Sequence, residues 1–168
     1  FLASYFVALP LGTAAGFGVA LVFVGIACLT DLETMSLHLG LMSALGLIGI
    51  CLAITGDIGF LTWHLTSAQA LAGALVSGMV PIVINATYRI LRGRNGFGEG
   101  DFWLLAALGA WLGPVMGPAL LVTASWLGVL YGVGMILAHR ASVMTKLPFG
   151  LFAGIVFILW PHLFSWVI

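Results

Sequence analysis

Long apolar runs fill most of this sequence and limit what it can fold into more than any other feature. Of its residues, 62% are hydrophobic and only 6% are charged, whereas a soluble domain has about 25% charged residues. No soluble fold of 168 residues could bury so much apolar surface, so we predict an integral membrane protein. The runs are continuous and lack the alternation of a barrel strand, which indicates helical spans.

The arrangement of these runs predicts a polytopic bundle. We expect an all-α protein with about six transmembrane helices, forming a single domain over residues 1–168. The expected spans are 2–30, 37–55, 68–91, 101–113, 119–137 and 147–168. Gly113-Pro114 and Gly117-Pro118 predict a turn between the fourth and fifth spans. Gly-x-x-x-Gly pairs, such as Gly109 with Gly113, predict close helix packing.

The basic residues predict how the spans are oriented. All five follow the third or the fifth span: Arg89, Arg92, Arg94, Arg140 and Lys146. With six crossings, the ends of the first, third and fifth spans lie on one side, which the positive-inside rule makes cytoplasmic. Asp31 ends the first span and Asp101 begins the fourth, so both would lie at this boundary. With a net charge of zero and no basic patch, we expect no nucleic-acid partner.

Asp31 and Asp101 are the candidates for chemistry. Two carboxyls that share a proton can hydrolyse a peptide bond, because one takes a proton from water while the other protonates the carbonyl oxygen. Gly98 and Gly100 would let another segment approach Asp101 closely. A helix that begins at Asp101 would favour its ionised form, although the pattern does not assign acid and base. The alternative is structural, with Asp101 as a helix N-cap and Asp31 as an interface residue.

Three segments resemble one family of membrane proteases. Residues 96–113, GFGEGDFWLLAALGAWLG, closely resemble the second aspartate motif of type IV prepilin peptidases, which are GxGD-type membrane aspartyl proteases. Residues 30–35, TDLETM, resemble the first aspartate motif. Residues 147–150, LPFG, are similar to the later proline-phenylalanine-glycine segment of the family. The resemblance runs from about residue 22 to residue 154 and covers most of the chain.

This resemblance implies an aspartic-type endopeptidase that needs no cofactor. Asp31 and Asp101 correspond to the catalytic pair, and Gly98 and Gly100 to the motif glycines. The implied partners are the lipid bilayer and a pilin-like or pseudopilin precursor, whose basic leader would be cleaved. The implied location is the bacterial inner (cytoplasmic) membrane, with the active site on its cytoplasmic face. That side agrees with the one derived from the basic residues.

The cysteines bear on a second activity of the family. Longer members carry a cysteine-bearing cytosolic region and also methylate the new N-terminus of their product. This sequence resembles a short form without that region, because its two cysteines, Cys28 and Cys51, both lie in apolar runs. We therefore expect neither methyltransferase activity nor a bound metal such as zinc.

Departures from the family pattern motivate a second hypothesis. Trp103 stands where the family usually has lysine, His38 and Leu39 where it has proline and then an acidic residue or asparagine, and Leu151 where it has a second proline. The loss of a lysine would remove a positive charge near the pair. The alternative is a catalytically degenerate relative that serves as a structural or scaffold subunit of a larger membrane complex.

Polar neighbours of the two aspartates have two interpretations each. Glu33 and Glu99 would either help to receive a basic leader or simply face solvent, and we favour solvent exposure. His38 lies seven positions after Asp31 and would either face the site or pack at the membrane boundary, which we favour.

Overall fold

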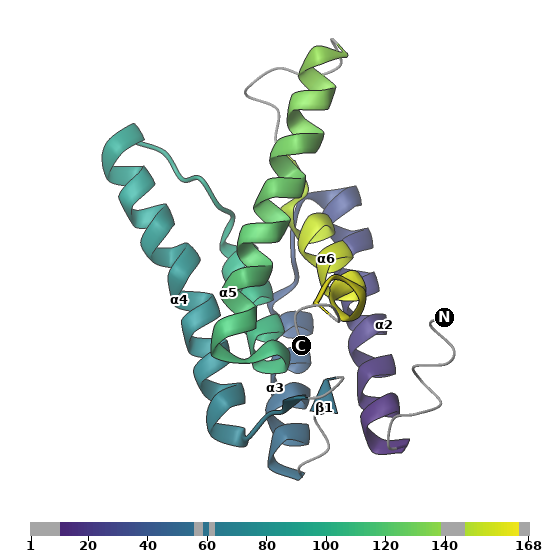
Figure 1. Cartoon of the computed structure of the whole chain (residues 1–168). Helices are drawn as coiled ribbons and strands as arrows, with labels where there is room; N and C mark the ends of the chain where they lie inside the picture. The colour runs from purple at the N-terminus through teal and green to yellow at the C-terminus, as the bar shows by residue number, and fades with distance from the viewer. Residues whose placement is uncertain (1–10, 56–58, 61–62, 139–146, 165–168) are drawn as a thin grey trace.

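The computed structural model describes residues 11–55, 59–60, 63–138 and 147–164, and almost all of them are helical (Figure 1). Its elements are α2 (Leu11–Thr34), α3 (Leu39–Thr55), β1 (Gly59–Phe60), β2 (Trp63–His64), α4 (Ser67–Arg92), α5 (Glu99–Leu137) and α6 (Phe149–Phe164). β1 and β2 pair antiparallel in a two-residue ladder between α3 and α4. The prediction of a helical protein is confirmed. The short ladder of β1 and β2 was not predicted.

Three of these helices are long and apolar enough to cross a membrane. They are the part of α2 from Ala15 to Thr34, α4, and α5. α3 and α6 are apolar but shorter. Many large apolar side chains on α4 and on the later part of α5 are exposed, as lipid-facing residues would be. The helices are therefore of membrane type, while the count of six crossings stays a prediction.

α5 is bent into two arms at Gly113. This glycine has φ 80° and ψ 179°, a conformation in the region that favours glycine. The Cα atom of Gly109 lies 3.1 Å from the place where a Cβ atom on Gly117 would stand, so the second arm returns beside the first (Figure 1). The predicted turn was too long, because one residue reverses the chain. Pro114 then begins the second arm, where its missing N–H costs little.

α2 continues beyond its expected end at Thr30. The helix runs to Thr34, so Asp31 lies inside its last turn and not after it. Met35 then leaves the helix with φ 52°, a left-handed conformation that usually takes glycine. Residues 2–10 of the first predicted span and residues 165–168 of the last lie outside the described residues.

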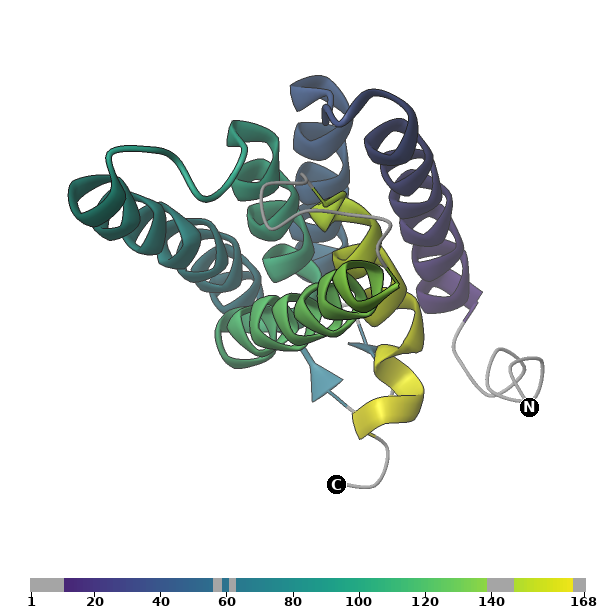
Figure 2. The same ribbon diagram turned by 90° about the horizontal axis from the view of Figure 1, so that it is seen from above.

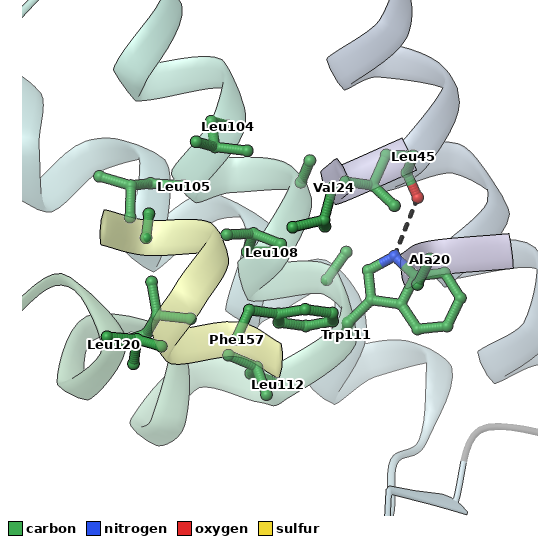
Figure 3. Packing of buried hydrophobic residues seen from close by; sticks show 14 of the residues in the cluster. Ala20, Val24, Leu45, Leu104, Leu105, Leu108, Trp111, Leu112, Leu120 and Phe157 are labelled. Atoms are coloured by element: carbon green, nitrogen blue, oxygen red, sulfur yellow. Dashed lines mark hydrogen bonds between the residues drawn. The ribbon is translucent and has the colours of Figure 1, made fainter. Parts of the chain in front are cut away.

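The first arm of α5 is the centre of the bundle. All residues from Leu104 to Gly113 except Ala106 are buried, so this arm is covered on every side. The indole Nε1 of Trp111 donates a hydrogen bond of 3.0 Å to the carbonyl oxygen of Leu45 in α3 (Figure 3). Phe157 of α6 packs into the same cluster. The arm that carries Asp101 is thus fixed by α3 on one side and α6 on another.

Glycines bring α4 against the bend in α5. A Cβ atom on Gly109 would collide with the carbonyl oxygen of Gly73, and one on Gly73 would stand 2.7 Å from the Cα atom of Gly113. A Cβ atom on Gly117 would collide with the hydroxyl of Ser77. The close packing predicted for the Gly-x-x-x-Gly pairs is confirmed for these three glycines of α5.

Candidate active site

Asp31 is held by the first turn of α6. Its side chain is buried, with 5% of its surface exposed. The Oδ2 atom accepts a hydrogen bond of 3.3 Å from the backbone N–H of Leu151. The first N–H groups of a helix have no partner inside the helix and carry partial positive charge, so they stabilise a carboxylate there. This contact compensates for an acidic group near the C-terminal end of α2, which the dipole of that helix disfavours.

Gly150 makes this contact possible. A Cβ atom at this position would stand 2.9 Å from Oδ2 of Asp31 and 3.2 Å from its Cγ atom. Cys28, one turn before Asp31, places its Sγ atom 3.7 Å from the carbonyl oxygen of Gly150. Any larger side chain at position 150 would therefore push α6 away from α2. The contact between α2 and α6 therefore explains why the LPFG segment has glycine at position 150.

Asp101 lies in the first turn of α5, two residues after the helix begins. Gly98 is the N-cap, and its backbone N–H donates to Oδ2 of Asp101 over 3.0 Å. Leu104, Leu105 and Leu108, which follow at helical spacing, are buried, so Asp101 is on the inward side of the arm. The structural alternative is therefore partly right, because this carboxylate does stabilise the start of α5, although from inside the first turn.

Contacts between neighbouring segments connect the end of α2, which carries Asp31, with the starts of α5 and α6. Seen from above, α5 and α6 lie between α4 on one side and α2 on the other (Figure 2). A Cβ atom on Gly100 would stand 2.7 Å from the Cβ atom of Leu37, in the loop after α2. The rings of Phe97 and Phe149 pack edge to face, with centroids 5.5 Å apart. Asp31 is close enough to Asp101 for their charges to interact. The end of α2 and the starts of α5 and α6 thus form one site.

The other predicted site residues have different surroundings. Gly98 and Gly100 are in the site, through the contacts given above. Glu33 is exposed, and it lies two residues after Asp31 on α2, a spacing that turns it roughly 200° away around the helix. Trp103 has the same spacing from Asp101 and is 51% exposed. His38 is exposed in the loop before α3. The helical positions of Glu33 and Trp103 thus turn their side chains away from the two aspartates, whereas His38 follows Leu37, which lies against Gly100.

Sequence reasoning missed Asn85 of α4. Its Oδ1 atom accepts two hydrogen bonds from the loop before α5, 2.7 Å from the backbone nitrogen of Gly96 and 3.1 Å from that of Phe97. The signal was present, because an amide in the apolar stretch 79–86 is costly unless it has a partner. The pairing of Phe97 with Phe149 had no comparable signal.

The described part of the chain offers carboxylates for chemistry but no group for a metal ion. Within it, no three His, Cys, Asp or Glu side chains gather as metal ligands would. Asp31 and Asp101 each have a carboxylate oxygen bound to a helix-starting N–H group. The fold and this site define a class: a helical, membrane-type protein with a pair of aspartates where three helices meet.

Comparison with known proteins gives the family. The model of the Type IV leader peptidase family matches residues 6–133, and the chain belongs to that family. This confirms the resemblance drawn from the motifs. The matched region includes both aspartates and ends before α6.

The relatives described below all have the same name, prepilin leader peptidase/N-methyltransferase. The chain is 38% identical over 95 residues to the prepilin leader peptidase/N-methyltransferase of Aeromonas salmonicida (strain A449), covering 55% of this chain and 33% of that protein. It is 42% identical over 82 residues to the protein of that name from Dickeya chrysanthemi, which covers 49% of this chain and 29% of that protein. It is 34% identical over 107 residues to the protein of that name from Neisseria gonorrhoeae, which covers 64% of this chain and 36% of that protein. The chain thus spans about a third of the length of these curated relatives. No solved structure matches it.

Proposed function

We propose that this chain is an aspartic-type endopeptidase that removes the leader from prepilin-like precursors. The observation that carries the proposal is that Asp31 and Asp101, far apart in the sequence, are held at the starts of α6 and α5, which the contact of Phe97 with Phe149 joins. Family membership supports the same activity, because the relatives that match the chain are named prepilin leader peptidases.

The geometry suits hydrolysis by a shared proton. Two negative charges near each other repel in poorly hydrated surroundings, which favours a state in which one carboxyl of the pair is protonated and the other is ionised. The carboxylate takes a proton from water, and the resulting hydroxide attacks the carbonyl carbon of the scissile peptide bond. The carboxylic acid protonates the carbonyl oxygen, and the tetrahedral intermediate then collapses as the amine leaves with a proton. Asp101 keeps part of its surface exposed, so water and substrate can approach the pair from its side.

Charges around the site support a cytoplasmic placement and a basic leader. Arg89 and Arg92 lie in the last turn of α4, and the following loop leads to Asp101. Under the positive-inside rule this end faces the cytoplasm. Glu33 and Glu99 are exposed near the two aspartates, where their negative charges would attract a basic leader. The precursor's apolar helix would lie alongside the bundle in the inner membrane.

The departures from the family pattern leave the pair and its supports in place. Trp103 is on the outward side of α5, His38 is exposed just before α3, and Leu39 is exposed as the first residue of α3. Leu151 still donates its backbone N–H to Asp31. The scaffold hypothesis is therefore not favoured, because the departures leave both carboxylates and the backbone N–H groups that bind them in place.

The test is cleavage of a precursor in membranes. The chain is co-expressed with a prepilin-like substrate, and the wild type is compared with Asp31→Asn and Asp101→Asn by mass spectrometry of the product. Asparagine keeps an oxygen that can accept the same backbone N–H, so both variants should fold. Wild type should cut and both variants should not. Asp57→Asn, which the sequence places on the opposite side of the membrane, serves as the matched control and should cut normally. A wild type that leaves several prepilins intact would contradict the proposal.

A further inference from the structure

Asn85 ties α4 to the loop that leads into the site. α4 ends at Arg92 and is capped by Gly93, whose φ of 71° turns the chain while its N–H donates to the carbonyl oxygen of Arg89 over 2.9 Å. The loop then leads from the end of α4 to the start of α5 (Figure 1). On its way, the backbone N–H groups of Gly96 and Phe97 donate to Oδ1 of Asn85. An amide oxygen has two lone pairs, so this one atom is fully used.

The residue after Phe97 is Gly98, whose backbone N–H binds the carboxylate of Asp101. Gly96 and Phe97 donate to Asn85, and Gly98 donates to Oδ2 of Asp101. Three consecutive amides are therefore directed by two side chains. Tyr88, about one turn after Asn85 on α4, also lies against this loop, because a Cβ atom on Gly96 would stand 3.2 Å from its Cδ1 atom. The orientation of Gly98, and with it that of the Asp101 carboxylate, depends on where Asn85 holds the loop.

The same contact reaches Asp31 through an aromatic pair. Phe97, fixed by its hydrogen bond to Asn85, packs edge-on against Phe149. Phe149 is the first residue of α6, and the following residues of that turn hold Asp31. One amide on α4 thus sets the loop that positions both halves of the site.

We propose that Asn85 is a positioning residue for the aspartate pair. It touches neither substrate nor reacting atoms, and it acts by fixing the Gly96–Gly98 backbone. The inference rests on the proposed peptidase function. A misplacement of about 1 Å at a catalytic group can cost about 100-fold in rate, so the loss of this contact should lower kcat strongly while KM changes little.

Two substitutions at position 85 separate positioning from packing. Asn85→Leu keeps the size of the side chain but removes the acceptor oxygen, and kcat should fall by about 10- to 100-fold. Asn85→Asp keeps an acceptor at the same place, with Arg89 one turn later as a partner for its charge, and should restore most of kcat. Thr87→Val is the matched control, because it removes a hydrogen bond to the carbonyl oxygen of Val83 without touching the loop. Its kcat should equal that of wild type.

The measurements are kcat and KM for a fluorescent prepilin peptide, together with amide hydrogen exchange over residues 94–98. We expect faster exchange in Asn85→Leu and near wild-type exchange in Asn85→Asp and Thr87→Val. If wild type cuts and Asn85→Leu cuts with the same kcat, the inference is overturned while the proposed function stands. A lower thermal stability of Asn85→Leu with unchanged kcat would also overturn it, because that result indicates a packing role alone. If wild type does not cut, the proposed function fails and this inference fails with it, whatever the exchange shows.

Discussion

Phe97 packs edge to face against Phe149, and this contact joins the segment before Asp101 to the helix start that holds Asp31. The two rings have centroids 5.5 Å apart at an interplanar angle of 89°. Neither aspartate is placed by its own helix alone. Each depends on an N-terminal turn, and the aromatic pair sets one turn against the other.

The aromatic contact should matter for both stability and cleavage. In a double-mutant cycle of Phe97→Ala and Phe149→Ala, the two changes should couple by about 0.5–1.5 kcal/mol in the free energy of unfolding. Each single change should also reduce cleavage. Tyr131 and Phe152, with centroids 5.6 Å apart, form a similar pair elsewhere, so Tyr131→Ala should lower stability alone. Additive effects at Phe97 and Phe149 would show that the pair does not couple the two turns.

Gly150→Ala should abolish cleavage. Its new methyl group would stand 2.9 Å from Oδ2 of Asp31, so the carboxylate or α6 must shift. The control is Gly25→Ala on α2, where nothing lies within 4 Å of the new Cβ atom. That change should leave cleavage intact and stabilise the helix by up to about 1 kcal/mol. Thermal unfolding and precursor cleavage on the same preparations give both readouts, and normal cleavage by Gly150→Ala would contradict the placement of Asp31.

Trp103→Lys, which introduces the residue usual in the family, should have little effect on cleavage. Trp103 is 51% exposed, and its position on α5 turns its side chain away from Asp101. An exposed substitution away from the site typically changes free energies by about 0.5 kcal/mol or less, which is roughly a twofold change in rate. The measurement is the initial rate of cleavage by purified protein. A rise of tenfold or more would mean that the tryptophan suppresses an activity that lysine supports.

Gly109→Ala should destabilise the whole bundle. The new methyl group would collide with the carbonyl oxygen of Gly73 and stand 2.6 Å from Cβ of Ser77, in a place where backbone limits relief. Overpacking of this kind costs about 1–3 kcal/mol. Gly134→Ala, in the second arm of α5 with no atom within 4 Å of its Cβ position, is the matched control and should be neutral. Equal melting temperatures for the two variants would show that α4 and α5 are less closely packed.

Much of the helical framework was predictable because it follows from local composition. The second and third predicted spans, 37–55 and 68–91, agree with α3 and α4 to within two residues. The end of α2 was not predictable, because Asp31 is accommodated in its last turn by α6, far away in the sequence. Met35 also ends that helix in a left-handed conformation without the glycine that usually signals it.

The candidate site was predictable in its acidic pair but not in its supports. Asp31 and Asp101 are conspicuous, because few ionisable residues interrupt the apolar runs. Their roles as a catalytic pair stay a prediction. The links between them could not be read from spacing, because Phe97 with Phe149 and Asn85 with Gly96 are tertiary contacts. Trp103 was predicted to lie beside the site because it follows Asp101 by only two residues. On a helix that spacing points its side chain outward, and it is exposed.

The bend at Gly113 has a consequence for how the protein sits in bilayers of different thickness. The first arm of α5, residues 99–112, is roughly 21 Å long at 1.5 Å per residue, shorter than a hydrocarbon core of about 30 Å. Because protein buries nearly all of this arm from Leu104 onward, its length need not match the lipid. Hydrophobic mismatch would be absorbed by tilting of the longer outer helices. The depth of Asp101 is therefore set by protein contacts and should vary little from one membrane to another.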